Sequence, residues 1–444
     1  MSSRRLENGT RVQAWDYEFD WTPEHLTSEQ LRPMIFSYDE LATRCLDRLD
    51  DLSPLHLRSK TQSKSKVAAS NDTAPGKQHP DLYEVLRERA PDDETLRQLW
   101  DQVTTVPDWV DWAQLERGQK VFYRYAGPSI VGLTFQSLLG GLGSARVVET
   151  LARTGGFGVS VVRRRLLSTF QHLLDVTHDI DSIKPGSSGR GFASSIRVRL
   201  LHASVRRRIL ALARSRPDYF DLSQHGVPIN DLDSLGTVLT FSATLIWIAL
   251  PRQGIRLRLD EVTDYLALWR YLAYILGAPS SHLCTPSQAR AMMESLLLSE
   301  LAHPGPSTTS RTLARNMLTA LAGQPPGYLS PSLLHAEAHW LNGHALADAL
   351  GVPRPAWHHT VLVAVQCAYF AVVCRARRSV RAWDEASIRR LRRLLEGIVL
   401  KEIGGERATH TFHYVPRLGK GTTGGTSGEG RRDVVTAQRS LWFW

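Results

Sequence analysis

The dominant pattern along this chain is a set of apolar residues that recur every three to four positions, separated by breaks rich in proline, glycine and serine. This spacing places the apolar side chains on one face of an α-helix, whereas the two-residue alternation that marks a strand is almost absent. The pattern therefore predicts an all-α fold. The clearest predicted helices cover residues 145–152, 159–176, 194–214, 235–250 and 260–276.

Two stretches lack this pattern and divide the chain. Residues 57–80 are rich in Ser, Lys, Thr and Asn and residues 419–432 are rich in glycine, which predicts flexible segments. No linker-like change in composition lies between them. We therefore expect an N-terminal helical extension over residues 1–97, a single large helical domain over 98–416, and a tail over 417–444 that ends in LWFW.

Two apolar runs approach the length of a membrane span. Residues 235–250 and 360–374 are about 15 residues each, short of the roughly 20 that a spanning helix needs. Both are therefore predicted to be buried core helices rather than transmembrane segments. Because Arg375, Arg377 and Arg378 follow the second run directly, peripheral contact with a membrane surface stays open.

Length and composition narrow the class of protein. The chain has 444 residues, of which 42% are hydrophobic, enough for a substantial core. Its net charge of +10 suits nucleic acid, an anionic membrane or an anionic cofactor, but no phosphate loop, zinc-finger spacing or aromatic stripe supports nucleic-acid binding. The first residues form no apolar signal segment and the 4 cysteines form no disulfide pattern, which predicts an intracellular, cytoplasmic protein.

A basic helix carries the most specific chemistry. Arg199, His202 and Arg206 fall at i, i+3 and i+7, so they lie above one another on one face of the helix predicted over 194–214. An imidazole between two guanidiniums suits a metal ligand inside a large anionic cofactor, such as haem, whose carboxylates the arginines would face. His202 also borders an apolar stripe, so an ordinary packed histidine is the alternative interpretation.

The preceding helix offers a second polar face. Arg165, Thr169 and His172 lie at i, i+4 and i+7, and the short loop after this helix predicts that the two helices pack as neighbours. They would then sandwich a flat cofactor between His202 and this polar face; a plain polar flank is the alternative. A helical hairpin is also expected to bring Glu149 against Arg165 as an acid/base group, with a surface glutamate as the alternative.

A rival metal motif lies at His335, Glu337 and His339, with His344 near by. Two histidines at i and i+4 can bind zinc, but Glu337 lies between them on the opposite face, unlike the general base of an HExxH site. A zinc site is therefore not favoured. Hydrolase chemistry also lacks support, because no GxSxG nucleophile motif is present.

Several segments resemble, in one order, the family that contains latex clearing protein (rubber oxygenase) and the fungal ER-bound oxygenase of mycophenolic acid biosynthesis. The resemblance spans about residues 100–416. The segments that carry it are VVETLARTGGFG at 147–158, RRLLSTF at 164–170, RVRLLHASVRRRI at 197–209, GVPINDLDSLGTVLTFS at 226–242, GIRLRLDEVTDYLALWRYLAYILGAP at 254–279 and HALADALGVPRP at 344–355.

This resemblance implies a nearly all-α protein whose globin-like helical core holds haem b and which uses dioxygen to oxygenate or cleave hydrophobic, often isoprenoid, molecules. By the family's pattern His202 is the proximal iron ligand, with Arg199 and Arg206 as its conspicuous neighbours. Arg165 and Thr169 match the family's distal arginine and threonine.

The same resemblance places Glu149 where rubber oxygenases carry an acidic residue near the distal arginine. Ser168 is a departure, because rubber-cleaving members have a lysine immediately before the distal threonine, and this argues against rubber as the substrate. We expect a haem b oxygenase that uses O2 to oxidise or cleave C=C bonds of a hydrophobic terpenoid, prenylated or lipid-like metabolite. The alternatives are a haem peroxidase or peroxygenase and a non-catalytic helical protein that binds haem or a lipophile. His172 is also open as a second axial ligand.

Overall fold

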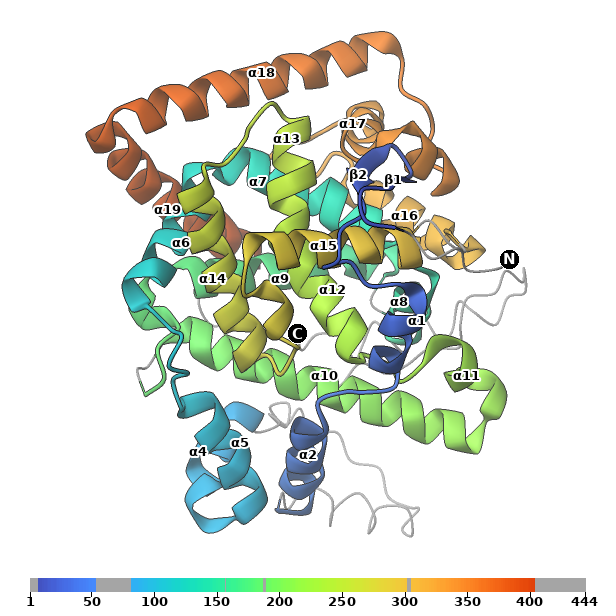
Figure 1. Ribbon diagram of the computed structural model, residues 1–444, viewed down its shortest axis with the longest axis vertical. Helices are drawn as coiled ribbons and strands as arrows, with labels where there is room; N and C mark the ends of the chain where they lie inside the picture. Colours follow the sequence, from blue (N-terminus) through green and yellow to red (C-terminus); the bar gives the residue numbers. More distant parts are fainter. Residues whose placement is uncertain (1–6, 53–80, 156, 187–188, 302–304, 404–444) are drawn as a thin grey trace, which may run out of the picture.

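A computed structural model describes residues 7–52, 81–155, 157–186, 189–301 and 305–403, and its regular structure is almost entirely helical (Figure 1). This confirms the predicted fold class at the level of a mostly helical chain. The segments predicted to be flexible and the LWFW terminus lie outside the described residues.

A small sheet near the N-terminus was not predicted. Strands β1 (Arg11–Ala14) and β2 (Tyr17–Asp20) pair antiparallel, and Val12 and Phe19 lie opposite each other with their side chains buried. Each strand is only 4 residues long, so its alternation is too short to stand out from the surrounding sequence.

The helices follow one another in three groups along the chain. The N-terminal helices are α1 (Ser28–Leu31), α2 (Glu40–Leu52), α4 (Leu82–Arg89), α5 (Glu94–Thr104), α6 (Trp112–Arg124), α7 (Ala126–Gly132) and α8 (Ala145–Arg153). The central helices are α9 (Val159–Thr177), α10 (Arg190–Ser215), α11 (Leu222–His225), α12 (Asp231–Phe241), α13 (Leu250–Arg252) and α14 (Leu259–Ile275). The C-terminal helices are α15 (Pro286–Leu296), α16 (Thr308–Leu321), α17 (Pro331–Ala349), α18 (Trp357–Ser379) and α19 (Arg381–Ile403).

Short 3₁₀ and π-helical segments connect these helices. The 3₁₀ segments are Arg32–Ile35, Ala90–Asp92, Ile180–Ser182, Pro217–Tyr219 and Ser281–Leu283, and the π-helical segments are Leu133–Leu139, Leu245–Ala249 and Leu297–Leu301.

One apolar core joins distant parts of the chain. It runs from Val12 in β1 to Val399 in α19, and the inner faces of α6, α10 and α14 supply much of it. The long helix α10 crosses the molecule, with α2, α4 and α5 beneath it (Figure 1). Residue 97, where the sequence suggests a boundary between extension and domain, lies inside α5.

Most predicted helices form close to their expected ends. α9 begins at Val159 as predicted, while α10 begins four residues before the expected start, at Arg190. The helix expected over 235–250 is interrupted at Ser242, whose φ of −116° and ψ of −83° are not helical. Its burial is confirmed, because most of its apolar side chains lie in the core.

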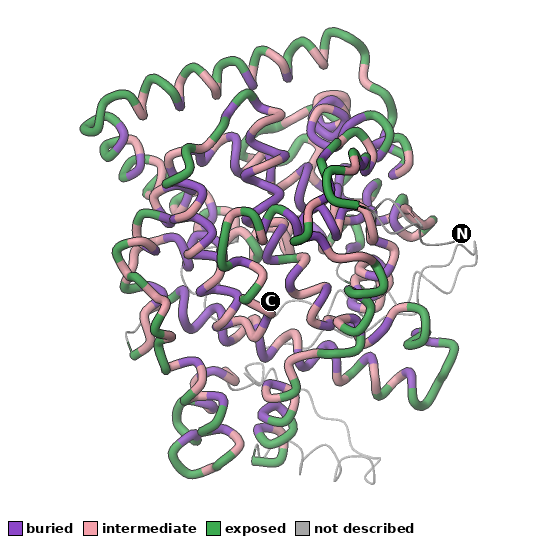
Figure 2. The backbone as a smooth tube through the Cα atoms, in the orientation of Figure 1, coloured by how far each residue is buried: buried purple, intermediate pink, exposed green. Residues whose placement is uncertain are grey.

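The second apolar run is not the buried core helix that was expected. Residues 360–374 do form part of α18, but only Val363, Cys367 and Cys374 of that helix are buried (Figure 2). α18 packs on α17 and α19 along one side and crosses the top edge of the molecule (Figure 1). Its outer side therefore meets no other element of the described chain.

Candidate functional site

The end of α9 and the start of α10 lie tightly side by side. A Cβ on Gly191 would come within 2.7 Å of the carbonyl oxygen of Asp175, so only glycine permits this approach. Three residues further on, Ser194 contacts His172, with 2.9 Å between the Ser194 Oγ and the Nδ1 atom of the imidazole. These two contacts confirm that the helices form an antiparallel pair.

The same stepping brings His202 opposite Arg165. From the contact between His172 and Ser194, moving seven residues back along α9 reaches Arg165, and moving eight forward along α10 reaches His202; both steps are about two helical turns. The electrostatics agree, because the charge of Arg165 is one of the causes that lower the pKa of His202.

His202 places a neutral imidazole inside the protein. Burial, followed by the charges of Arg206 and Arg165 and by the imidazole of His172, lowers its pKa from 6.5 to about 4. The ring is therefore neutral at pH 7, which is the form that binds a metal. The side chain keeps part of its surface accessible, and within the described residues no hydrogen bond reaches either ring nitrogen.

Helix α9 carries the polar set expected from sequence. Burial lowers the pKa of Arg165 to about 10, and its Nη1 donates to the Thr154 hydroxyl at 2.9 Å while its guanidinium lies 5.0 Å from the centre of the Phe157 ring. Thr169 is exposed, and its hydroxyl donates to the carbonyl oxygen of Arg165 at 3.1 Å. Burial also lowers the pKa of His172 to about 4.

Arg165, His172 and His202 combine partly accessible surface with strong desolvation. Every residue from Arg163 to His172 keeps accessible surface, although α6, α10, α16 and α19 all pack against α9. Residues on an outer surface would be solvated, and their pKa values would stay near the ordinary range. Here, desolvation dominates the pKa shifts of Arg165, His172 and His202.

Arg199 has a different role from the expected one. Its Nε and Nη2 donate to Asp39 at 2.6 and 3.0 Å, a second bond from Nη2 reaches Gln102 at 2.9 Å, and its side chain is almost completely buried. Although Arg199 follows the predicted spacing, its donors are taken up by the N-terminal region. This corrects the expectation that it faces the carboxylates of a cofactor.

Arg206 is bound to the same N-terminal region. Its Nη1 donates to the carbonyl oxygen of Asp39 at 3.1 Å and to the hydroxyl of Thr43 at 3.0 Å, and its Nη2 donates to the carbonyl oxygen of Ile229 at 2.8 Å. Its guanidinium also lies 4.8 Å from the ring centre of Tyr38. Arg206 influences His202 by its charge, but its hydrogen bonds fasten the segment before α2 to α10.

Glu149 does not contact Arg165, which corrects the second expected pair. It forms an i, i+4 ion pair with Arg153 at 3.1 Å on α8. Arg165 instead binds Thr154, the residue that follows α8. The helical hairpin does bring the end of α8 to α9, but Glu149 lies five residues before Thr154, which on a helix is about 140° around the axis.

The rival histidine motif is occupied by contacts within the protein. Nδ1 of His339 lies 3.1 Å from Nδ1 of His344, and its Nε2 lies 3.2 Å from the carbonyl oxygen of Val352. Glu337 accepts a hydrogen bond from Gln366, and burial raises its pKa to about 7. Within the described residues, no group of three or more His, Cys, Asp or Glu side chains is arranged to hold a metal ion.

Sequence reasoning missed Asp39, which organises the basic helix from outside it. Asp39 lies just before α2 and accepts the backbone N–H of Ala42 at 3.2 Å, which is typical of a residue that caps a helix. That signal predicts the start of a helix. It carries no information about the buried arginine 160 positions away that shares the carboxylate.

Comparisons with known proteins agree with one another. The family model described as ER-bound oxygenase mpaB/B'/Rubber oxygenase, catalytic domain, matches residues 123–396. A rubber oxygenase from Streptomyces sp. (strain K30) is 24% identical over 266 residues, which cover 58% of this chain and 61% of the relative. The matched part thus spans less than two thirds of that relative. The structure of latex clearing protein LCP in the closed state has a TM-score of 0.55 and 20% identity, covering 82% of this chain and 91% of that one.

Proposed function

The chain belongs to the family of the ER-bound mpaB and rubber oxygenase catalytic domains, and on that basis we propose that it is a haem b-dependent oxygenase of a hydrophobic metabolite. The observation that carries the proposal is His202, a neutral imidazole with partly accessible surface near Arg165. A desolvated histidine without a hydrogen-bond partner among the described residues suits an iron ligand better than a packed core residue.

The chemistry of the residues around His202 is compatible with a haem group. His202 would supply the proximal nitrogen, and the partly open middle of α9 would form the opposite wall. When bound, haem supplies an iron centre that activates dioxygen. Because Arg199 and Arg206 are engaged by Asp39 and Thr43, the haem carboxylates would be met by other cations or by solvent.

The chain's own residues would act by positioning and by polarity. Arg165 is held in place by Thr154 and Phe157, and among the described residues its remaining N–H groups have no acceptor, so they stay available to a ligand. Thr169 adds an exposed hydroxyl one turn away. Glu149 remains a candidate acid/base group, but it is linked to Arg165 only indirectly, through the C-terminal turn of α8.

The proposed substrate is a terpenoid, prenylated or other lipid-like molecule with a C=C bond. Cleavage of such a bond into two carbonyl groups consumes one O2 and needs no external reductant. The apolar side chains near the polar set, such as Leu166, Phe170 and Leu201, are partly buried and leave apolar surface for a lipophile.

The test is the absorption spectrum of protein expressed with a haem precursor. We expect a Soret band that is lost in His202→Ala and retained in His282→Ala, a matched control in which another half-buried histidine is removed. A band lost equally in His172→Ala would indicate two axial histidines. A wild type without a Soret band but with a helical circular dichroism spectrum would contradict the proposal and favour a binding protein.

The oxidant is tested separately. Turnover of unsaturated lipophiles should require O2 and proceed with catalase present. Turnover only with added hydrogen peroxide would replace the oxygenase by a peroxygenase.

A further inference from the structure

Helix α18 combines high hydrophobicity with high exposure. It carries no Lys, Arg, Asp or Glu from Trp357 to Cys374. By length and composition it is one of two helical segments, among the described residues, that are apolar enough to cross a membrane, but its apolar window is only 17% buried, against 61% for Asp231–Arg252. Burial in the core accounts for the apolar character of Asp231–Arg252. The apolar character of α18 has no such explanation, because most of the helix is not buried.

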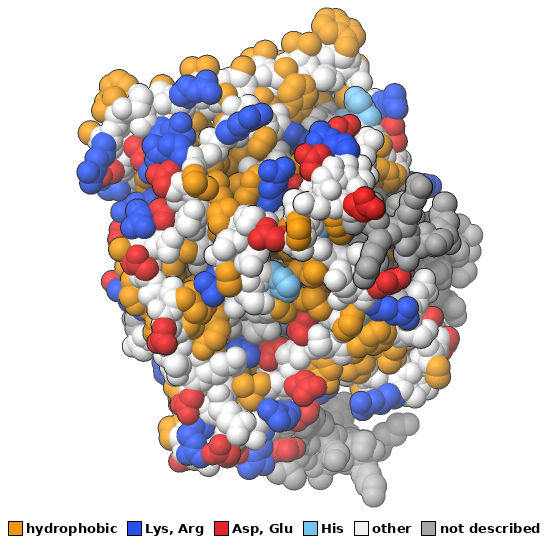
Figure 3. All heavy atoms as spheres, viewed as in Figure 1, with side chains coloured by type: hydrophobic (Ala, Val, Ile, Leu, Met, Phe, Trp, Pro, Cys, Tyr) orange, Lys and Arg blue, Asp and Glu red, His pale blue; other side chains and the backbone are white. Residues whose placement is uncertain are grey.

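The exposed apolar residues of α18 form one stripe. Val361, Leu362, Val365, Tyr369 and Val372 are 49%, 54%, 61%, 61% and 65% exposed. Their spacing of i, i+1, i+4, i+8 and i+11 places them on one side of the helix. In the space-filling view, apolar side chains follow the top edge of the molecule where α18 runs (Figure 3). We call these five residues the apolar stripe.

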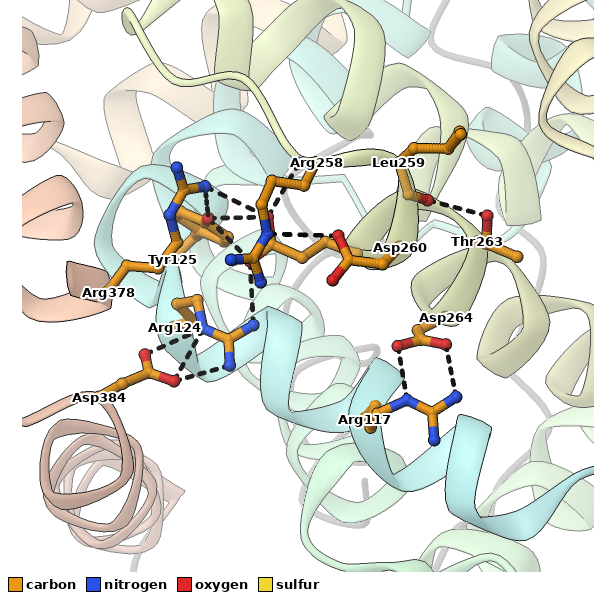
Figure 4. Close-up of polar contacts among 11 residues, drawn as sticks. Arg117, Arg124, Tyr125, Arg258, Leu259, Asp260, Thr263, Asp264, Arg378 and Asp384 are labelled. Carbon is orange, nitrogen blue, oxygen red and sulfur yellow. Dashed lines mark hydrogen bonds and ion pairs between the residues drawn. The ribbon is translucent and has the colours of Figure 1, made fainter. Parts of the chain in front are cut away.

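The opposite side of α18 is fastened to the body. Val363 and Cys367 are buried, and Gln366 donates a hydrogen bond to Glu337 of α17. At the C-terminal end, Nη1 of Arg378 donates to the Tyr125 hydroxyl at 2.9 Å and lies 3.3 Å from Oε2 of Glu261 (Figure 4). These contacts fix which side of α18 faces outward.

The start of α19 is fastened by the same network. Arg124 of α6 binds Asp384 at 2.7 Å and Glu261 at 3.0 Å, so one arginine joins α6, α14 and α19 (Figure 4). The negative charge of Asp384 is thereby balanced by Arg124. The turn between α18 and α19 is held against the body at two points.

The chain that follows the stripe is rich in positive charge. Eight arginines lie from Arg375 to Arg393, against two acidic residues, Asp384 and Glu385. Both acidic groups already have arginine partners. Arg375, Arg389 and Arg390 are exposed, and this surface is complementary to an anionic one.

Large aromatic residues mark both ends of the stripe. Trp357 begins α18 and is 78% exposed, and Trp383 follows its C-terminal end and is 62% exposed. The tryptophan ring, with an apolar body and one N–H group, is favoured at the boundary between lipid headgroups and acyl chains.

We propose that α18 docks the protein on an anionic lipid bilayer, lying along its surface with the apolar stripe in the headgroup boundary and the arginines of α18 and α19 on anionic headgroups. Apolar burial and attraction to anionic lipid together are what hold an interfacial helix. α18 does not need to leave the body, because the contacts of Gln366 and Arg378 lie on the side away from the stripe. This inference stands independently of the proposed haem chemistry.

Vesicle flotation of the full-length protein tests the proposal. We expect the wild type to float with vesicles containing about 30% phosphatidylglycerol, weakly with pure phosphatidylcholine, and less as salt is raised. The variant Val365→Glu/Tyr369→Glu/Val372→Glu should lower the partition coefficient by about tenfold or more. Leu259→Glu is the matched control, since Leu259 is 73% exposed but lies outside α18, and it should float like the wild type.

A charge variant separates the two contributions. Arg375→Glu/Arg389→Glu/Arg390→Glu should lose the preference for anionic vesicles while the apolar stripe is intact. Circular dichroism and the Soret band of both triple variants should match the wild type, which distinguishes this test from that of the haem proposal.

Four outcomes would overturn the proposal. The first is that the wild type fails to float. The second is that the stripe variant floats unchanged, which would assign binding to another part of the chain. The third is that light scattering without lipid shows a wild-type dimer that the stripe variant abolishes, which would make a second copy the occupant. The fourth is that the bound protein resists extraction at alkaline pH, which would indicate insertion across the bilayer.

Discussion

His202 and His172 are both strongly desolvated, and within the described residues neither imidazole has a carboxylate as an ion-pair partner. Burial lowers the pKa of each from 6.5 to about 4. The neutral form is therefore built into the fold, and it is also the form that a metal needs. The arrangement that prepares the ligand makes the haem-free protein sensitive to acid.

The prediction for these residues concerns this acid sensitivity. Between pH 6.5 and about 4 the unfolded chain binds protons at both histidines and the folded chain does not. The free energy of unfolding of haem-free protein should therefore fall as the pH falls through this window. We expect the two histidines together to account for about 1–2 kcal/mol of this fall in the free energy of unfolding, allowing for their partly open surface.

Urea unfolding at pH 7, 6 and 5 measures this contribution. The double variant His172→Gln/His202→Gln should lose less stability over this range than the wild type, because the remaining titrating groups are common to both. Equal losses would show that neither imidazole is desolvated in the folded protein.

At the scale of single elements, the end of α14 lies against the ion pair between Asp39 and Arg199 of α10. Gly277 follows the C-terminus of α14 with a φ of +71°, as the sequence predicts for a helix-ending glycine. A Cβ at this position would collide with the Asp39 carboxylate and the Arg199 guanidinium. One glycine therefore both ends a helix and leaves room for a buried ion pair.

The prediction for this element compares two glycines with the same backbone role. Gly351 also follows a helix, with a φ of +74°, but its nearest neighbour would lie at 3.8 Å from a Cβ, an ordinary contact. Gly351→Ala should lower the free energy of unfolding by about 1 kcal/mol from backbone strain alone. Gly277→Ala should cost about 3 kcal/mol, since it also displaces the Arg199–Asp39 pair.

Denaturant unfolding of the two glycine variants gives the comparison directly. Similar losses would mean that the pair moves aside without cost. An unchanged Soret band in Gly277→Ala would agree with a structural role for Arg199. Loss of the band with normal stability would instead indicate that Arg199 contributes to cofactor binding.

At the scale of the whole molecule, the N-terminal region is part of the main core. Val12 and Leu49 pack in the same cluster as residues of α10 and α14, and Asp39 and Thr43 hold Arg199 and Arg206. We expect thermal unfolding to show one transition, coincident by far-ultraviolet circular dichroism and tryptophan fluorescence. A separate early transition that disappears when residues 1–97 are removed would show that the extension is an independent unit.

Local sequence patterns suffice for the helical class, most helix positions and the pairing of α9 with α10, because these follow from periodicity and short loops. They also predict that His202 faces Arg165, whose charge is one of the causes that lower the pKa of His202. The resemblance carried by short segments identified a family that the comparisons confirm.

The partners of the charged residues and the burial of α18 depend instead on tertiary contacts. Spacing along α10 groups Arg199 with His202, but Asp39, 160 positions away, takes the guanidinium. Likewise α18 carries no charged side chain from Trp357 to Cys374, and the local sequence does not indicate that only one side of the helix is covered. Periodicity reports which residues share a face, whereas what lies opposite that face depends on contacts between distant segments, which the folded chain alone brings together.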